Sequence, residues 1–64
     1  MSNNQKAGFA ALLTINDVCA VCKVSDKTVR RWIKAKELPA ARLGGQWRIR
    51  PRDLEIFIRD RLTR

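Results

Sequence analysis

The chain has 64 residues, of which 14 are Lys or Arg and six are Asp or Glu, giving a formal net charge of +8. A chain this short forms one domain at most and leaves no room for a core and a separate catalytic cleft. It contains no run near the ~18 apolar residues of a membrane span and no convincing signal peptide. Its charge favours a polyanionic partner, most often nucleic acid.

The excess charge is concentrated in the middle of the chain. Residues 23–52 contain ten basic and two acidic residues, which is the whole net charge, and the other residues contain four of each. A run of charges is usually a solvated surface, but this one is flanked by two neutral, amphipathic segments. The arrangement favours a dedicated binding surface.

Residues 1–12 are polar and then small, and are expected to form a flexible N-terminal arm before a domain over residues 13–64. Thr14 and Asp17 have the spacing of a capping box at the start of a first helix. Only about three residues, Cys22 to Val24, separate the end of this helix from a second helix, a spacing typical of a tight helix-turn-helix. The apolar side of the first helix consists of Ile15, Val18, Cys19 and Cys22.

The second helix is expected to start at the N-cap Ser25 and to end near Lys36, before Pro39. Lys23 occupies the preceding turn, where glycine is common because it accepts a positive φ. The cations of this helix fall between roughly 100° and 200° from Val29 on a helical wheel, opposite the apolar side. That apolar side consists of Val29, Trp32 and Ile33.

On a lone helix these cations would form an ordinary solvated face, but the second helix of such a pair enters the major groove. Arg30 and Arg31 are predicted to read bases, because Arg commonly donates two hydrogen bonds to guanine. Lys27 and Lys34 are predicted to contact phosphates. The residues nearest the base edges would be Ser25, Lys27 and Thr28.

Residues 40–49 are expected to form a β-hairpin centred on Gly44-Gly45. A two-residue loop would place Arg42 opposite Trp47 on one face. A three-residue loop, Gly44-Gly45-Gln46, places Leu43 opposite Trp47 and Arg42 opposite Arg48, with apolar side chains inward and both arginines outward. We therefore predict the three-residue loop. Arg42 and Arg48 could then meet phosphates or enter a narrow minor groove. The alternative interpretation of the two glycines is a turn with no role in binding.

The last segment begins with Pro51, which suits the first position of a helix. Trp32 and Trp47 lie on the apolar sides of their elements and are expected in the core, rather than stacking on single strands. The sequence thus predicts a mainly α fold with a small β-hairpin. The apolar side of the third helix consists of Leu54, Phe57, Ile58 and Leu62.

Cys19 and Cys22 form a Cys-x-x-Cys pair, but the chain has no other Cys and no His to complete a zinc site. A site shared between two chains is the alternative, and a redox pair would need a thioredoxin-like context. We expect two small buried thiols, reduced as in a cytoplasmic protein. With no His, no Tyr and no paired carboxylates in an apolar setting, we expect no enzyme, cofactor or metal.

The segment Leu13–Ile58 resembles the excisionase-type helix-turn-helix family, relatives of the MerR-like winged helix. The resemblance rests on "LT", "VSDKTVRRWI", "ELPAARLGG", "WRI" and "DLEIFI". Lys23 replaces the usual turn glycine, and Pro51 lies one place later than in many relatives. The resemblance implies a winged helix-turn-helix with three helices plus a two-stranded wing. Its DNA contacts would come from Ser25, Lys27, Thr28, Arg30, Arg31 and Lys34, and in the wing from Gly45, Gln46 and Arg48.

Small stand-alone members of that family resemble excisionases, or recombination directionality factors, which bend DNA near an attachment site and help an integrase excise a mobile element. We therefore expect sequence-specific binding to double-stranded DNA, with an integrase and neighbouring copies of the protein as partners, in a bacterial or phage setting. The alternative is a small transcriptional regulator. A MerR-type regulator is less expected, because the chain ends at Arg64 without a long dimerisation helix. General RNA or nucleic-acid binding is a third possibility.

Overall fold

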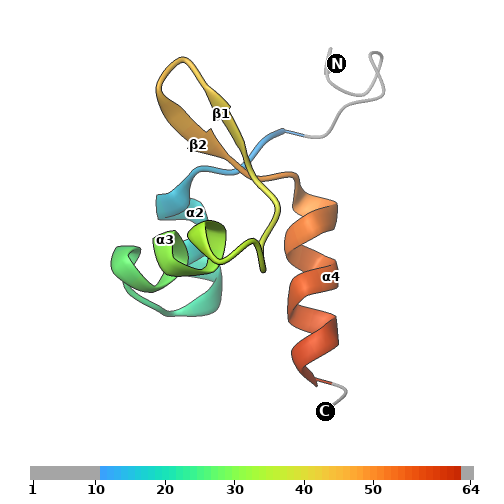
Figure 1. The fold of residues 1–64 in the computed structure, drawn as a ribbon. Helices are drawn as coiled ribbons and strands as arrows, with labels where there is room; N and C mark the ends of the chain where they lie inside the picture. The colour runs from blue at the N-terminus through green and yellow to red at the C-terminus, as the bar shows by residue number, and fades with distance from the viewer. Residues whose placement is uncertain (1–10, 63–64) are drawn as a thin grey trace.

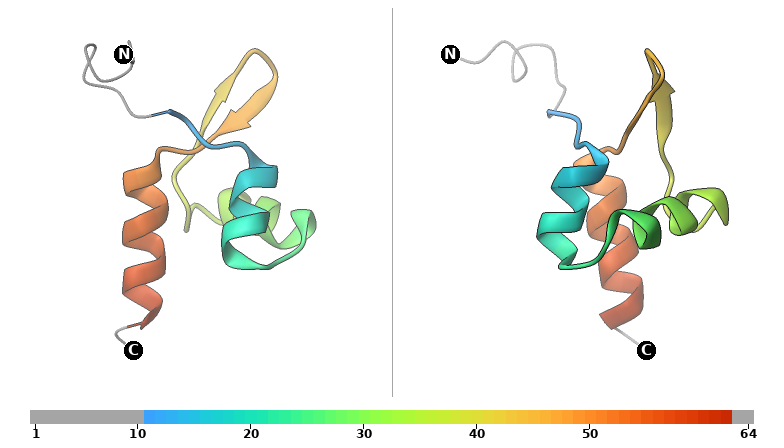
Figure 2. Two further views of the ribbon diagram at one scale, coloured as in Figure 1. Left: turned by 180° about the vertical axis from the view of Figure 1, so that it is seen from behind. Right: turned by 90° about the vertical axis from the view of Figure 1, so that its left-hand side faces the viewer.

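The computed structural model describes residues 11–62 as three helices and a two-stranded antiparallel sheet, labelled as in Figure 1. The sheet projects beyond the helices, and α4 stands beside the α2–α3 pair (Figures 1 and 2). This is a winged helix-turn-helix, which confirms the predicted fold class. The elements are α2 (Ile15–Cys22), α3 (Asp26–Lys34), β1 (Ala41–Leu43), β2 (Gln46–Arg48) and α4 (Pro51–Leu62).

Side chains cap the first turns of α2 and α3. The Asp17 amide donates to Thr14 Oγ1 at 3.0 Å, and the Thr14 amide donates to Asp17 Oδ2 at 2.9 Å, so the predicted capping box is present. The Thr28 amide donates to Ser25 Oγ at 3.2 Å, which confirms Ser25 as the N-cap of α3. These local bonds fix where both helices begin.

A lysine in the left-handed conformation follows each of these two helices. Lys23, with φ 59°, ends α2, and Lys36, with φ 65°, follows α3. The amides of Glu37 and Lys36 donate to the carbonyls of Trp32 and Ile33 at 2.9 and 3.0 Å. This is a Schellman motif with lysine where glycine is usual. The helix itself ends at residue 34, slightly before the predicted end.

The core lies between the three helices and the base of the sheet. Trp32 of α3 and Phe57 of α4 are in ring contact, with centroids 4.7 Å apart. Trp32 and Trp47 pack against the core but are only half-buried. Leu62 was predicted on the apolar side of α4 but is 79% exposed, because the helix extends beyond the elements that it covers. The buried residues are Ile15, Val18, Val29, Ile33, Leu38, Ile49, Leu54 and Phe57.

The base of the wing is tied to the start of the domain. Leu13 and Ile49 exchange two antiparallel backbone hydrogen bonds, each 2.8 Å long. The chain entering α2 therefore runs beside the end of β2, and Ile49 is fully buried beneath it. The predicted arm over residues 1–12 lies outside the described residues except for Ala11 and Leu12.

The hairpin loop has two residues, and the predicted three-residue loop is wrong. Gly44 and Gly45 have φ angles of 58° and 80°, and positive φ at both central residues is what a two-residue type I′ turn requires. The prediction rejected this loop because it places an arginine and a tryptophan on one face. The observed partners are Ala41 with Arg48, Arg42 with Trp47, and Leu43 with Gln46.

Candidate nucleic-acid interface

The exposed side of α3 carries the predicted recognition residues. Val29 and Ile33 of this helix are buried, so its opposite side faces solvent. Thr28 is half-buried, and the other predicted residues of this element are exposed: Ser25, Lys27, Arg30, Arg31 and Lys34. The helix therefore presents four cations outward, as the helical wheel predicts.

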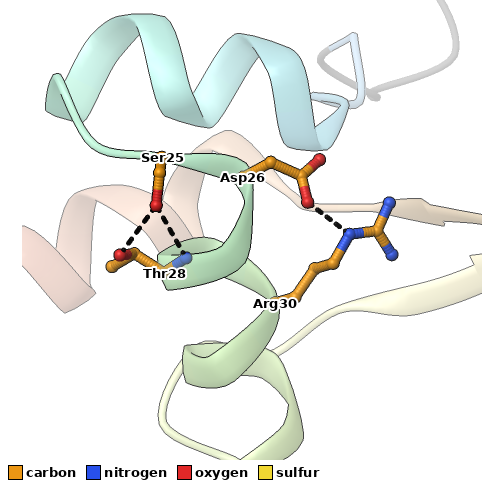
Figure 3. A network of polar contacts seen from close by, with 4 residues as sticks. All are labelled: Ser25, Asp26, Thr28 and Arg30. Carbon is orange, nitrogen blue, oxygen red and sulfur yellow. Dashed lines mark hydrogen bonds and ion pairs between the residues drawn. The ribbon is translucent and has the colours of Figure 1, made fainter.

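Ser25 and Thr28 are engaged with each other at the start of α3. Their hydroxyl oxygens lie 3.1 Å apart, and Ser25 Oγ also accepts the Thr28 amide (Figure 3). This geometry accounts for Ser25 as a helix cap. A direct contact of either hydroxyl with DNA stays a prediction.

Arg30 is held by a carboxylate one turn earlier in the same helix. Its Nε donates to Asp26 Oδ1 at 2.5 Å, and both side chains are about half exposed (Figure 3). Within residues 11–62, Lys27, Arg31 and Lys34 have no ion-pair partner. Arg30 is thus the one cation of α3 whose direction an ion pair fixes.

The two predicted arginines of the wing lie on opposite faces of the hairpin. Arg42 is paired with Trp47 and Arg48 with Ala41, and side chains alternate between faces along a strand. Arg42 Cζ lies 5.1 Å from the centre of the Trp47 ring, within cation–π range. Arg48 Nη1 donates to the Trp47 carbonyl at 3.0 Å. The prediction that both arginines share an outward face is wrong, because a guanidinium can stack on tryptophan.

A cleft of about 320 Å³ lies between the wing and the helix pair. Thr14 and Asn16, from the start of α2, form one part of its wall, and Asp26 forms another. It brings together five of the predicted site residues: Arg30, Arg42, Gly45, Gln46 and Arg48. The other predicted residues of α3 do not line this cleft, although Lys34 lines a neighbouring hollow with Arg30 and Trp47.

Sequence reasoning missed Asp26 and Trp47 as residues of this cleft. The four-residue spacing of Asp26 and Arg30 on one helix was a usable signal, because side chains at that spacing meet. Trp47 was placed in the core, and its position beside Arg42 depends on the hairpin register. Only the backbone of the turn reveals that register.

Two arginines at α4 have acidic partners. Arg50 donates to Asp53 from Nε at 2.6 Å and from Nη2 at 3.0 Å, and this hydrogen bonding, with the carboxylate charge, raises the pKa of Arg50. Arg61 donates to Glu37 at 3.1 Å and lies over the Phe57 ring. These pairs offset part of the basic charge near α4, whereas three cations of α3 keep theirs unpaired.

Cys19 and Cys22 are free thiols that pack against the core, half-buried rather than buried as predicted. Burial, and to a lesser extent Cys19, raises the pKa of the Cys22 thiol. Over the described part of the chain, no three His, Cys, Asp or Glu side chains gather as a metal site would require. In the same residues, no helix combines the length and apolar character needed to cross a membrane.

Comparison with known proteins places this chain in a family. A family model described as a helix-turn-helix domain matches residues 12–62, which is most of the chain. The match covers α2, α3, both strands of the wing and α4. Neither the curated proteins nor the solved structures contain a significant match. The chain therefore belongs to the helix-turn-helix domain family, and this membership implies binding to double-stranded DNA.

Proposed function

We propose that the protein is an excisionase, or recombination directionality factor. It binds a specific duplex near an attachment site, bends it, and promotes excision of a mobile element by an integrase. The observation that carries the proposal is that α3 and the wing border one cleft with three arginines on its walls: Arg30, Arg42 and Arg48. A recognition helix in the major groove and a wing on the flanking strand or minor groove would grip the duplex at two places, as bending requires.

Each predicted residue has a role in this proposal. Arg30 and Arg31 read bases from the exposed side of α3, and Lys27 and Lys34 bind phosphates, with Ser25 and Thr28 at the helix start nearest the base edges. Arg42 and Arg48 contact the backbone or the minor groove from opposite faces of the wing. Gly45 and Gln46 lie at the wing tip and let the backbone approach the DNA.

The site must first be found and its bending measured. Selection from random duplexes with the full chain identifies the preferred sequence, and a gel-mobility series with the site at varied positions measures the bend. We expect adjacent sites to fill cooperatively, with neighbouring copies in contact. Arg31→Ala should cost about 1–3 kcal/mol on the selected site and relax its sequence. Arg59→Ala, which removes an exposed arginine of α4, is the matched control.

A search for an integrase gene beside the gene of this protein comes first, and excision in vitro by an integrase found in this way decides the biological role. We expect the wild-type protein to raise excision, and Arg31→Ala to lose that effect while Arg59→Ala keeps it. If tight, specific binding leaves excision unchanged but alters transcription from a neighbouring promoter, the protein is a regulator and the excisionase proposal fails.

A further inference from the structure

We infer that Asp26 is a positioning residue for DNA recognition, which holds the Arg30 guanidinium so that its two terminal amino groups face a guanine in the major groove. The inference rests on the proposed DNA-binding function and assigns a role to a residue that the electrostatics of a DNA surface would otherwise disfavour. It concerns the direction of Arg30, and it makes Asp26 a determinant of specificity without a contact of its own to DNA.

The geometry leaves the useful edge of Arg30 open. A guanidinium has five N–H donors, and Arg30 commits the one on Nε to Asp26 Oδ1 at 2.5 Å. The other four donors are on the two Nη groups, which form the fork that matches O6 and N7 of guanine. Among the described residues, nothing accepts a hydrogen bond from those groups. In Figure 3 both terminal nitrogens point away from α3.

The charge of Asp26 argues against a purely incidental pair. Residues 23–52 contain only two carboxylates, and the other, Glu37, pairs with Arg61 of α4. Asp26 instead lies in the first turn of α3 and lines the same cleft as Arg30. There it would repel approaching phosphates, although a negative charge suits the positive end of the helix dipole. An ion pair this exposed adds little to stability, so its main effect is to restrict where the Arg30 guanidinium points.

The chain contains a matched control for this carboxylate. Asp53 also lies in the first turn of its helix, and its Oδ2 accepts from Arg50 Nε at 2.6 Å. Asp53 also accepts from Arg50 Nη2 at 3.0 Å, so Asp53→Asn weakens two arginine bonds where Asp26→Asn weakens one. Each variant removes one carboxylate charge and leaves an amide oxygen, which is a neutral and weaker acceptor for arginine. Only Asp26→Asn makes this change beside the proposed recognition surface.

The experiment is selection from random duplexes with wild-type, Asp26→Asn, Arg30→Ala and Asp53→Asn proteins, followed by affinities for the wild-type site and an unrelated duplex. We expect Asp26→Asn and Arg30→Ala to lose a guanine preference at one shared position, and Asp53→Asn to keep it. Asp26→Asn should bind the selected site roughly tenfold more weakly, within the range of one lost bidentate contact. It should bind the unrelated duplex no more weakly than wild type, because it repels phosphates less.

The loss of affinity for the selected site, without a loss for the unrelated duplex, distinguishes a positioning role from a folding defect. A folding defect would weaken both affinities together. Replacing the selected guanine by 7-deazaguanine, which lacks the N7 acceptor, should weaken wild-type binding and leave Asp26→Asn nearly unaffected. If Asp26→Asn keeps the guanine preference, the inference is overturned while the proposed function stands. If the wild-type protein enriches no sequence at all, the proposed function fails and the inference fails with it.

Discussion

Arg42 and Trp47 face each other across the wing, with Arg42 Cζ 5.1 Å from the centre of the indole ring. Both residues line the cleft beside α3, so this contact joins the wing surface to the proposed interface. An exposed cation–π pair contributes about 0.5–1 kcal/mol, which favours the register that a simple sorting of apolar and charged residues rejects. In that register Leu43 lies on the other face and is half exposed.

The two-residue turn predicts how the wing responds to substitution at Gly44. Its φ is +58°, and an added Cβ would meet no atom within 4 Å, so any cost is conformational rather than steric. Gly44→Ala should lower the free energy of unfolding by about 1 kcal/mol, whereas Gly44→Asn should cost clearly less, because Asn tolerates this conformation. Urea denaturation of the two variants measures the difference. Equal losses for Ala and Asn would contradict the turn geometry.

Lys23 should store strain at the turn between α2 and α3. It has φ 59° and ψ 46°, a left-handed conformation that glycine adopts without penalty. Lys23→Gly should be more stable than Lys23→Ala by about 1 kcal/mol, since only the first relieves the backbone strain. The alanine variant is the control for the lost charge. Thermal or urea unfolding tests this, and an alanine variant as stable as the glycine variant would show that the turn is unstrained.

Local signals explain what could be predicted from the sequence. Thr14 and Ser25 predict the starts of two helices, because a capping side chain bonds to backbone groups within three residues of itself. Helix ends were less certain, since Lys23 and Lys36 take conformations for which lysine has no preference. The same limit applies at the wing, where the φ angles of Gly44 and Gly45 decide the register.

One part of the proposed interface could be predicted from the sequence and another part could not. The exposed cations of α3 follow from helical periodicity around Val29, so the sequence places them correctly. The cleft does not follow, because it depends on how the hairpin is set against α2 and α3. Trp47 and Arg42 therefore line the interface in an arrangement that periodicity within one strand could not predict.

Cys22 provides a test of packing through its pH dependence. Burial first, and then Cys19, raises the pKa of its thiol above the ordinary value of 9.0. The unfolded chain then loses this proton at lower pH than the folded chain, so the stabilising contribution is complete below pH 9.0 and is lost as pH rises through the folded pKa. In a Cys19→Ser variant, which keeps the burial, alkylation of Cys22 should reach half its maximal rate at a higher pH when folded than in urea. Coincident midpoints would contradict this packing.

Arg48 should contribute one phosphate contact from the wing. Each neutralised phosphate adds about 0.9 to the slope of log affinity against log salt concentration, so Arg48→Ala should reduce that slope by about one unit. Its Nη1 already donates to the Trp47 carbonyl, which holds the side chain close to the wing backbone. Arg48→Lys keeps the charge and should retain most of the slope, and Arg59→Ala on α4 should leave it unchanged. Titrations over a range of salt concentrations measure the slope for all three variants. An unaltered slope in Arg48→Ala would show that Arg48 makes no phosphate contact from the wing.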